Sequence, residues 1–395
     1  MTTNSGLEEA ARRVIYKVAN EIANNLNNKT PTHLLALDFE KAYDTLWVKG
    51  FIYKLLSMGF SLHICKFLFN YLSNRSYKVE VGNSYSYSYI AQAGTPQGSV
   101  LSCLIFILYV SDFPTHEGSL NINISQFADD VLISTSTQIT CLAQEELNNY
   151  LSKIVQYTNK WKIKINTNKC EEIAVVGNRV QTTRRVRKDC RNIRLYLNNE
   201  PLKKTTNLKY LGVYISKNFK FNHHLNYIRT KMLAAFFVLK SIFFNRKINP
   251  KVKILAYKQI IKSIALYACP IWLQVSKPQI EIISRLERKM LRACCGLYRR
   301  PGSVKYFKNS TLYDKCSINP IQSELINYTI RFCGKLYNNN NLNLREFDNM
   351  ENLHYYKSKP PAYIYYLANR NELFHNNELM YYRNLKTIRD YRQRV

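Results

Sequence analysis

Three aspartates at the ends of apolar, strand-like segments constrain this chain more than any other feature of its sequence. The short apolar run 33–37 has the composition of a buried strand and ends in Asp38. Asp129 and Asp130 follow 91 residues later, between two β-rich flanks that predict a hairpin over 122–134 with the acids at its turn. Carboxylates in an apolar setting need a compensating charge, so a fold that gathers them must also provide for a cation.

The donor chemistry of these acids favours a hard metal ion. Oxygen ligands without His or Cys select Mg²⁺, with Mn²⁺ as an alternative, and such ions bridge protein carboxylates to substrate phosphates. In a two-metal site one ion activates a hydroxyl and the other stabilises the leaving group. Because adjacent strand residues point to opposite faces, we expect Asp129 to be the main partner of Asp38, and Asp130 a weaker ligand. The alternative is structural: two turn-forming aspartates and one capping aspartate.

The charge of the chain points to an anionic partner. Its 395 residues carry 57 Lys and Arg against 27 Asp and Glu, a net charge of +30. Such an excess is usually neutralised by nucleic acid or an acidic membrane, with compositional drift as the plainer explanation. Because 46% of the residues are hydrophobic and only 12 are Gly and 11 Pro, the chain can bury real cores, and a mainly disordered basic tail is excluded.

Targeting and redox signals are largely negative. The N-terminus has no apolar segment behind a positive start, and the longest apolar run, 100–110, is about half of the ~20 residues that a membrane helix needs. The ten cysteines are scattered without a C-x-x-C pair, which argues against a zinc module and against a secreted disulfide framework. We therefore expect an intracellular protein, in the nucleus, the cytoplasm or both, that is neither secreted nor embedded in a membrane.

Hydrophobic periodicity predicts a first half that mixes strands and helices and a second half that is helical. Besides the segments above, we expect a hairpin over 77–90 around Gly82-Asn83, a strand at 173–176 and a basic insert at 179–194 that is solvated more than structured. A run at 338–341 is expected to be a loop followed by short helices. The predicted helices are 8–26, 48–72, 99–110, 140–161, 222–244, 250–268 and 276–296.

Five segments occur in an order that is similar to the successive palm motifs of reverse transcriptases, and more narrowly of the jockey-like group of non-LTR, LINE-type retrotransposons. They are LLALDFEKAYD (34–44), AGTPQGSVLS (93–102), QFADDVLI (126–133), KINTNKCEEI (164–173) and KYLGVYI (209–215). The segments ALYACPIWLQVS (265–276) and ISRLERKMLRACCG (283–296) also resemble the helical region that follows in those elements. Any one motif alone is a weak signal, but the ordered set is a strong one.

The resemblance implies a role for each matching position around the acids. Asp38, Asp129 and Asp130 would be the metal-binding and catalytic triad. Phe39, Tyr43, Gln97 and Gly98 would lie at the incoming nucleotide. A bulky ring at Tyr43 would clash with a ribose 2′-OH and favour deoxynucleotides, while a core aromatic is the structural alternative. Gly98 would let the backbone approach a base pair, and a turn at a helix start is the alternative for both Gln97 and Gly98.

The resemblance also implies roles for three residues further along the chain. Lys169 matches a lysine that neutralises or protonates the departing pyrophosphate, with a solvated lysine as an equal alternative. Leu211 and Gly212 resemble the primer-grip hairpin that aims the primer 3′-OH, with a simple tight turn as the alternative. The second motif continues with Cys103 after Ser102, where the family usually carries Pro, which alters a helix start but no ligand.

The fold implied is α+β: a right-hand polymerase palm, with a small antiparallel sheet and packed helices, followed by an all-helical thumb and a C-terminal extension. We expect a residual fingers or palm helix at 1–33, the palm at 34–215, the thumb at 216–300 and the extension at 301–395. Since only about 37 residues precede Asp38, we expect a truncated copy that lacks the fingers and the endonuclease of the group.

The expected function is RNA-directed DNA polymerisation by a non-LTR retrotransposon enzyme, which adds dNTPs to a DNA primer on an RNA template with Mg²⁺. The alternative is a catalytically inactive nucleic-acid-binding remnant, which the +30 charge and the expected truncation support. An RNA-directed RNA polymerase shares the palm logic but ranks low, because Phe127-Ala128 and Tyr43 favour deoxynucleotide use. The sequence does not indicate the oligomeric state.

Overall fold

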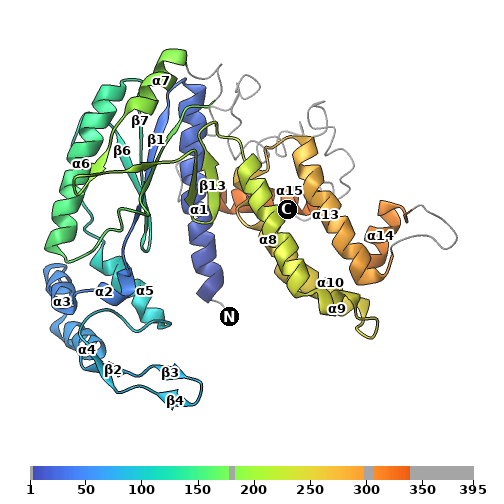
Figure 1. The fold of residues 1–395 in the computed structure, drawn as a ribbon, viewed down its shortest axis with the longest axis horizontal. Coiled ribbons are helices and arrows are strands. Elements are labelled where there is room, and N and C mark those ends of the chain that lie inside the picture. The colour runs from blue at the N-terminus through green and yellow to red at the C-terminus, as the bar shows by residue number, and fades with distance from the viewer. Residues whose placement is uncertain (1–2, 178–182, 298–305, 339–395) are drawn as a thin grey trace. The chain divides into compact units, whose positions relative to one another are not determined.

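The computed structural model describes residues 3–177, 183–297 and 306–338, which form two compact units (Figure 1). Residues 30–210 make up one unit, called here the sheet unit. The described residues of 3–29 and 211–338 make up the other, called the helical unit. The first helix of the chain therefore groups with the C-terminal part of the chain, and each unit is described by itself.

The sheet unit combines strands and helices in alternation. Its helices are α2 (Ala42–Thr45), α3 (Val48–Ser57), α4 (Leu62–Leu72), α5 (Val100–Tyr109), α6 (Thr140–Lys160) and α7 (Arg184–Asn192). Its strands are β1 (Thr32–Asp38), β2 (Arg75–Tyr77), β3 (Glu80–Val81), β4 (Ser84–Tyr85), β5 (Tyr89–Ala91), β6 (Ile122–Phe127), β7 (Asp130–Ser136), β8 (Glu171–Val175), β9 (Tyr196–Leu197), β10 (Glu200–Pro201), β11 (Lys203–Lys204) and β12 (Asn207–Tyr210).

Five strands of this unit form one sheet with β1 at its centre, in the order β11-β8-β1-β7-β6. All neighbours are antiparallel except β11 and β8. Leu35 and Leu37 of β1 and Val131 and Ile133 of β7 are buried in a core shared with α5 and α6, and Figure 1 shows α6 running alongside the sheet. The alternating hydrophobic residues of the central strands thus pack one face of the sheet against helices. Polar residues can then lie at the strand ends.

The helical unit contains the first helix and the second half of the chain. Its helices are α1 (Thr3–Asn27), α8 (Asn222–Val238), α9 (Lys240–Phe244), α10 (Pro250–Ala256), the π-helix η1 (Tyr257–Lys262), α11 (Ser263–Leu266), α12 (Cys269–Trp272), α13 (Lys277–Cys295), α14 (Asn309–Cys316) and α15 (Ile321–Asn338). Its one short strand among the described residues is β13 (Val213–Ser216). Tyr16 of α1 packs edge-on against Phe332 of α15 with ring centroids 5.5 Å apart, which ties the first helix to the last.

The α+β fold class is confirmed, with a small sheet in one unit and helices throughout the described part of 217–338 in the other. The single helix predicted over 48–72 was wrong: α3 and α4 are separated at Gly59, which has φ 82°, and Ser61 caps α4 by accepting from the amide of Ile64. Apolar periodicity continued through this break, so the sequence pattern hid it.

The basic insert also differs from its prediction where it is described. Residues 184–192 form helix α7, whose N-cap Thr183 accepts a hydrogen bond from the amide of Val186. Cys190 is buried, so this segment packs on the unit instead of standing free in solvent. Residues 179–182, the run 338–341 apart from residue 338, and most of the predicted extension 301–395 lie outside the described residues.

Candidate active site

The ends of two neighbouring strands bring the predicted acids together. Asp38 is the last residue of β1 and Asp130 the first of β7, and the antiparallel register places these two residues directly opposite each other. Residues opposite each other in an antiparallel pair project from the same face of the sheet. Because the two residues are far apart in sequence, it is the pairing of β1 with β7 that creates this carboxylate pair.

Asp129 lies in the two-residue turn between β6 and β7, because Phe127 pairs with Asp130 across that hairpin. Ala128, the other turn residue, has φ 54°, a positive angle of the kind that tight hairpin turns use. By strand register Asp130 lies opposite Asp38 and Asp129 lies in the turn, and the ranking of Asp129 as the main metal-site partner of Asp38 stays a prediction. Of the two acids predicted at the hairpin turn, Asp129 lies in the turn and Asp130 is the first residue of β7.

The three carboxylates act on one another electrostatically. The pKa of Asp130 is raised by burial and by the negative charges of Asp129 and Asp38, and Lys209 partly opposes this. Burial raises the pKa of Tyr43, with contributions from its hydrogen bond to Cys103 and from Asp129 and Asp130. Like charges held together in this way favour the uptake of a cation or a proton.

The donor set fits a hard divalent cation, because all three groups are carboxylates that reach solvent at least in part. Within residues 3–177, 183–297 and 306–338, no three His, Cys, Asp or Glu side chains are grouped so as to hold a metal ion. The three aspartate side chains therefore do not form a complete set of metal ligands. The backbone thus places the carboxylates as neighbours at the ends of β1 and β7 and in the adjoining turn.

The turn at residues 166–170 also contacts Asp38. The amide of Asn166 donates to the carbonyl of Asp38 at 2.8 Å, and the amide of Asp38 lies 3.5 Å from the Sγ of buried Cys170. Lys169, in the same turn, places its Nζ 3.5 Å from Oδ2 of Asp38 while remaining largely exposed. Lys169 is therefore next to the acids, and Cys170, which sequence reasoning did not single out, anchors its turn.

Tyr43 follows Asp38 on the short helix α2, after Lys41 at φ 48° turns the chain. Its hydroxyl lies 3.7 Å from the Sγ of Cys103, and its ring packs against Phe106 with centroids 5.3 Å apart. Tyr43 is half-buried against α5, as expected of a core aromatic, and it is close enough to Asp129 and Asp130 for their charge to raise its pKa. Phe39, by contrast, is buried against Phe106, so only its backbone is available to a nucleotide.

The loop before α5 holds Gln97 and Gly98 at the surface. Gly94 has φ 83°, and a Cβ there would lie 2.6 Å from the carbonyl oxygen of Asp44, so only glycine fits at this crossing. The Nε2 of Gln97 donates to Oδ1 of Asp44 at 2.8 Å. Gly98 has φ 82°, a backbone angle that favours glycine. The space around Gly98 is open, so crowding does not exclude a larger residue there. Gly94 and Asp44 were missed as site-forming residues, although both lie inside the quoted motifs.

Leu211 and Gly212 belong to the helical unit, so their position relative to the carboxylates is not described. Both have positive φ angles, 43° and 76°, as a tight primed turn requires. The hydroxyl of Tyr267 donates to the carbonyl of Leu211 at 2.8 Å, and a Cβ on Gly212 would lie 3.2 Å from the Tyr267 ring. The guanidinium of Arg12 stacks over that ring at 5.5 Å. The turn is thus held by a network that the sequence did not reveal.

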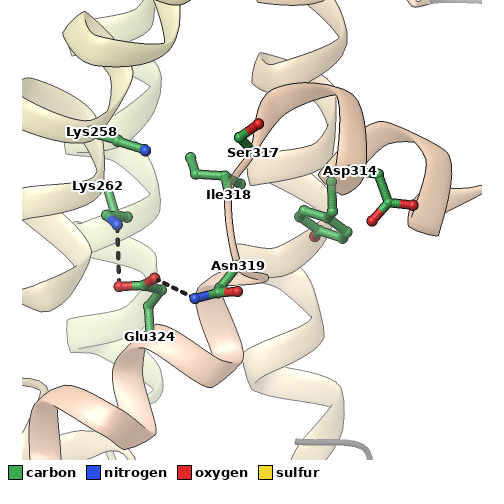
Figure 2. Close-up of a pocket in the computed structure, with 8 residues that line it drawn as sticks. Lys258, Lys262, Asp314, Ser317, Ile318, Asn319 and Glu324 are labelled. Atoms are coloured by element: carbon green, nitrogen blue, oxygen red, sulfur yellow. Dashed lines mark hydrogen bonds and ion pairs between the residues drawn. The ribbon is translucent and has the colours of Figure 1, made fainter. Parts of the chain in front are cut away.

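A cavity of about 510 Å³ in the helical unit contains none of the predicted site residues (Figure 2). Figure 2 shows Lys262 paired with Glu324, at 3.2 Å, and Asn319 donating to the same carboxylate at 3.3 Å. The cavity is lined by Lys258, Lys262, Tyr313, Asp314, Ser317, Ile318, Asn319 and Glu324. Two cations and two acids balance here, so the cavity has no clear preference for an anion.

Comparison with known proteins decides the family. Residues 4–215 match the family described as reverse transcriptase (RNA-dependent DNA polymerase), which is more than half of the chain. The chain belongs to the reverse transcriptase family. Its match covers all the motif segments from 34 to 215, including the strand pair that carries the acids. Reverse transcriptases generally depend on metal ions, in agreement with the carboxylate donor set.

Similar proteins come from non-LTR transposons of Drosophila. The chain is 25% identical to a probable RNA-directed DNA polymerase from transposon X-element of Drosophila melanogaster, over 83% of this reverse transcriptase chain and 34% of the relative. It is also 25% identical to the RNA-directed DNA polymerase from mobile element jockey of Drosophila funebris, over 73% and 31%. The chain therefore spans about a third of the length of these relatives.

Among solved structures, this chain shows a weak similarity to telomerases. The apo telomerase of Candida tropicalis matches with a TM-score of 0.38 and 11% identity, over 89% of this chain and 56% of that one. Telomerase of the same species with a fragment of telomeric RNA matches with a TM-score of 0.37 and 10% identity, over 81% and 50%. These scores are too low to carry residue-level conclusions to this reverse transcriptase.

Across the described residues, no helix has both the length and the apolar character to cross a membrane.

Proposed function

We propose that the chain catalyses RNA-directed DNA synthesis as the polymerase part of a non-LTR retrotransposon protein. The observation that carries the proposal is the register pair Asp38–Asp130 with Asp129 in the adjoining turn, in a chain of the reverse transcriptase family. The substrates would be a DNA primer, an RNA template and dNTPs. The palm would comprise residues 34–215, the thumb 216–300 and a C-terminal extension 301–395, with 1–33 as a residual fingers or palm helix.

In this reaction the primer 3′-oxygen bonds to the α-phosphorus of the dNTP, the bond to the β-phosphate oxygen breaks, and pyrophosphate leaves. Asp38, Asp129 and Asp130 would hold Mg²⁺, which activates the primer hydroxyl and stabilises the leaving group when bound. Lys169, 3.5 Å from Asp38, would donate a proton to the leaving pyrophosphate. Tyr43 would exclude a ribose 2′-OH, and Gln97 and Gly98 would border the nucleotide. Leu211 and Gly212 would aim the primer end.

Primer extension on poly(rA)/oligo(dT) with Mg²⁺ tests the proposal. Extension should fall at least about a hundred-fold in Asp129→Asn and in Asp130→Asn, since each removes charge from the reacting centre. Asp189→Asn is the matched control, because Asp189 is a carboxylate of the same unit that faces Arg185 on α7 at 3.9 Å. Extension that survives Asp129→Asn unchanged would remove Asp129 from the mechanism.

A second candidate function is that of an inactive nucleic-acid binder, which the +30 net charge favours. Binding of a primer–template to such a protein weakens steeply with salt whether or not a dNTP is present. A functional polymerase instead binds its primer–template more tightly when Mg²⁺ and the matching dNTP are added. Filter binding across a salt series, with matching and mismatching dNTP, therefore separates the two functions.

A further inference from the structure

An exposed hairpin before the Gln97 loop presents tyrosines to solvent. Residues 75–91, called here the tyrosine hairpin, include strands β2 to β5 and project beyond α4 (Figure 1). Its four tyrosine side chains are half to nine-tenths exposed: Tyr77 55%, Tyr85 66%, Tyr87 88% and Tyr89 51%. Large rings exposed together on one small element mark a binding surface more often than a packing element.

Two of these rings already form a stacked pair. Tyr77 of β2 and Tyr89 of β5 are register partners, and their rings stack with centroids 5.7 Å apart at 29°. In the inner pair, Tyr85 lies opposite Glu80 and donates its hydroxyl to Oε1 of that residue at 3.0 Å. The Tyr77, Tyr85 and Tyr89 side chains therefore have partners within the hairpin before any ligand arrives, which lowers the entropy that binding must overcome.

The hairpin is joined to the predicted nucleotide loop by a single arginine. The guanidinium of Arg75 donates to the carbonyl of Ala93 at 3.0 Å and to that of Gly94 at 2.6 Å. Gly94 is locked against Asp44, whose carboxylate holds Gln97. The tyrosines and the loop that would border the nucleotide thus form one connected structure within the sheet unit.

The charge of the hairpin suits an anionic partner with flat groups. Its ionisable side chains other than tyrosine are Arg75, Lys78 and Glu80, which leaves one net positive charge on a chain of +30. Nucleic-acid bases stack on exposed aromatic rings regardless of sequence, and a basic surface retains the phosphates. A protein partner would also accept tyrosine and serine contacts, but the connection to the Gln97 loop favours a nucleic-acid strand.

We propose that the tyrosine hairpin is a stacking platform for unpaired nucleic-acid bases, namely those of the single-stranded template RNA next to the nucleotide loop. The identification of the strand as template rests on the proposed function, whereas single-strand binding itself does not. Tyr85 and Tyr87 supply exposed rings, and the stacked pair Tyr77–Tyr89 lies on β2 and β5 of the same hairpin.

Binding of a fluorescein-labelled 20-nucleotide oligo(rA), followed by anisotropy without primer, dNTP or metal, tests this proposal. The double variant Tyr85→Ala/Tyr87→Ala should bind with a Kd roughly 10- to 100-fold higher, as expected for lost base stacking. Tyr85→Phe/Tyr87→Phe keeps the rings and should bind like wild type, whereas Tyr85→Leu/Tyr87→Leu should bind as weakly as the alanine variant. Tyr196→Ala, an exposed tyrosine elsewhere in the sheet unit, should bind like wild type.

Equal affinity of the alanine variant and wild type would overturn the proposal. Rescue by leucine as complete as that by phenylalanine would also overturn it, because an apolar docking surface for a protein does not need a ring. The slope of log Kd against log salt should be unchanged in every variant, since no phosphate contact is removed. If the wild type does not extend primers but its oligo(rA) binding depends on Tyr85 and Tyr87, the proposed function alone is contradicted. If the wild type extends primers but its oligo(rA) binding does not depend on these tyrosines, the stacking platform alone is contradicted.

Discussion

The two units hold their carboxylates in opposite ways. In the helical unit, the buried Glu287 accepts hydrogen bonds from the Tyr313 hydroxyl at 2.9 Å, the Ile321 amide at 2.9 Å and the Tyr257 hydroxyl at 3.2 Å. In the sheet unit, Asp130 is exposed and faces two further carboxylates, Asp129 and Asp38. A buried carboxylate that accepts several hydrogen bonds typically has a structural role. A carboxylate near the surface beside other carboxylates more often binds a ligand.

The same comparison explains the direction of both pKa shifts. Burial raises the pKa of Glu287 to about 7, and its three hydrogen bonds limit the rise. The pKa of Asp130 is raised by partial burial and by repulsion from its neighbours, which a bound cation would relieve. Removing the two carboxylates should therefore change stability in opposite directions.

Glu287→Ala should give the largest loss of stability. It leaves the buried Tyr257 hydroxyl, the buried Ile321 amide and the partly buried Tyr313 hydroxyl without their acceptor, and each buried group costs about 1–3 kcal/mol. We expect the free energy of unfolding to fall by about 3 kcal/mol or more, measured by urea denaturation. Glu8→Ala in the same unit removes an exposed carboxylate paired with Arg12 at 2.6 Å and should cost less than about 1 kcal/mol. Equal losses in both variants would contradict a structural role for Glu287.

The pH dependence of stability should identify Glu287 as well. Because its folded pKa is raised from 4.5 to about 7, the native state holds the proton more tightly than the unfolded state. Its contribution to stability is full below about pH 4.5 and is lost as the pH rises to about 7, at no more than about 1.4 kcal/mol per pH unit. His224 in the same unit has its pKa lowered to about 4 and acts in the opposite sense.

The difference between wild type and Glu287→Gln isolates the glutamate from that histidine. Urea denaturation at several values between pH 4.5 and 8 should show the wild type losing stability relative to Glu287→Gln up to about pH 7, with a constant difference above it. A difference that does not change with pH would mean that the pKa of Glu287 is the same in the folded and unfolded states, so that burial does not raise it.

Asp130→Asn should produce a smaller change of the opposite sign. Removing one of three neighbouring negative charges should stabilise the metal-free protein by less than about 1 kcal/mol, because the site reaches solvent. Added Mg²⁺ should raise the Tm of the wild type, and this increase should shrink in Asp130→Asn. A metal-free Asp130→Asn protein less stable than wild type would show that Asp130 is held by structural contacts.

The contrast also shows what sequence can and cannot reveal. Asp38, Asp129 and Asp130 lie in short local patterns, at a strand end and in a hairpin turn, so they could be found without a structure. Glu287 has no such pattern, because its three donors come from residues 30 positions upstream and 26 to 34 positions downstream. The register that places Asp130 opposite Asp38 is not contained in those local patterns, because it depends on how β1 pairs with the distant strand β7.

Lys169→Ala should leave the free energy of unfolding almost unchanged. Any loss of primer extension in this variant would therefore reflect a chemical role of Lys169 and not a structural one. The side chain is 67% exposed, and an ion pair of this kind contributes little to folding. If Lys169 protonates the departing pyrophosphate, primer extension should fall by about a hundred-fold or more in Lys169→Ala. Lys169→Arg restores the positive charge but holds its proton too tightly to serve as an acid, so it should rescue substrate affinity and not the rate. Full rescue by arginine would assign Lys169 a purely electrostatic role beside Asp38.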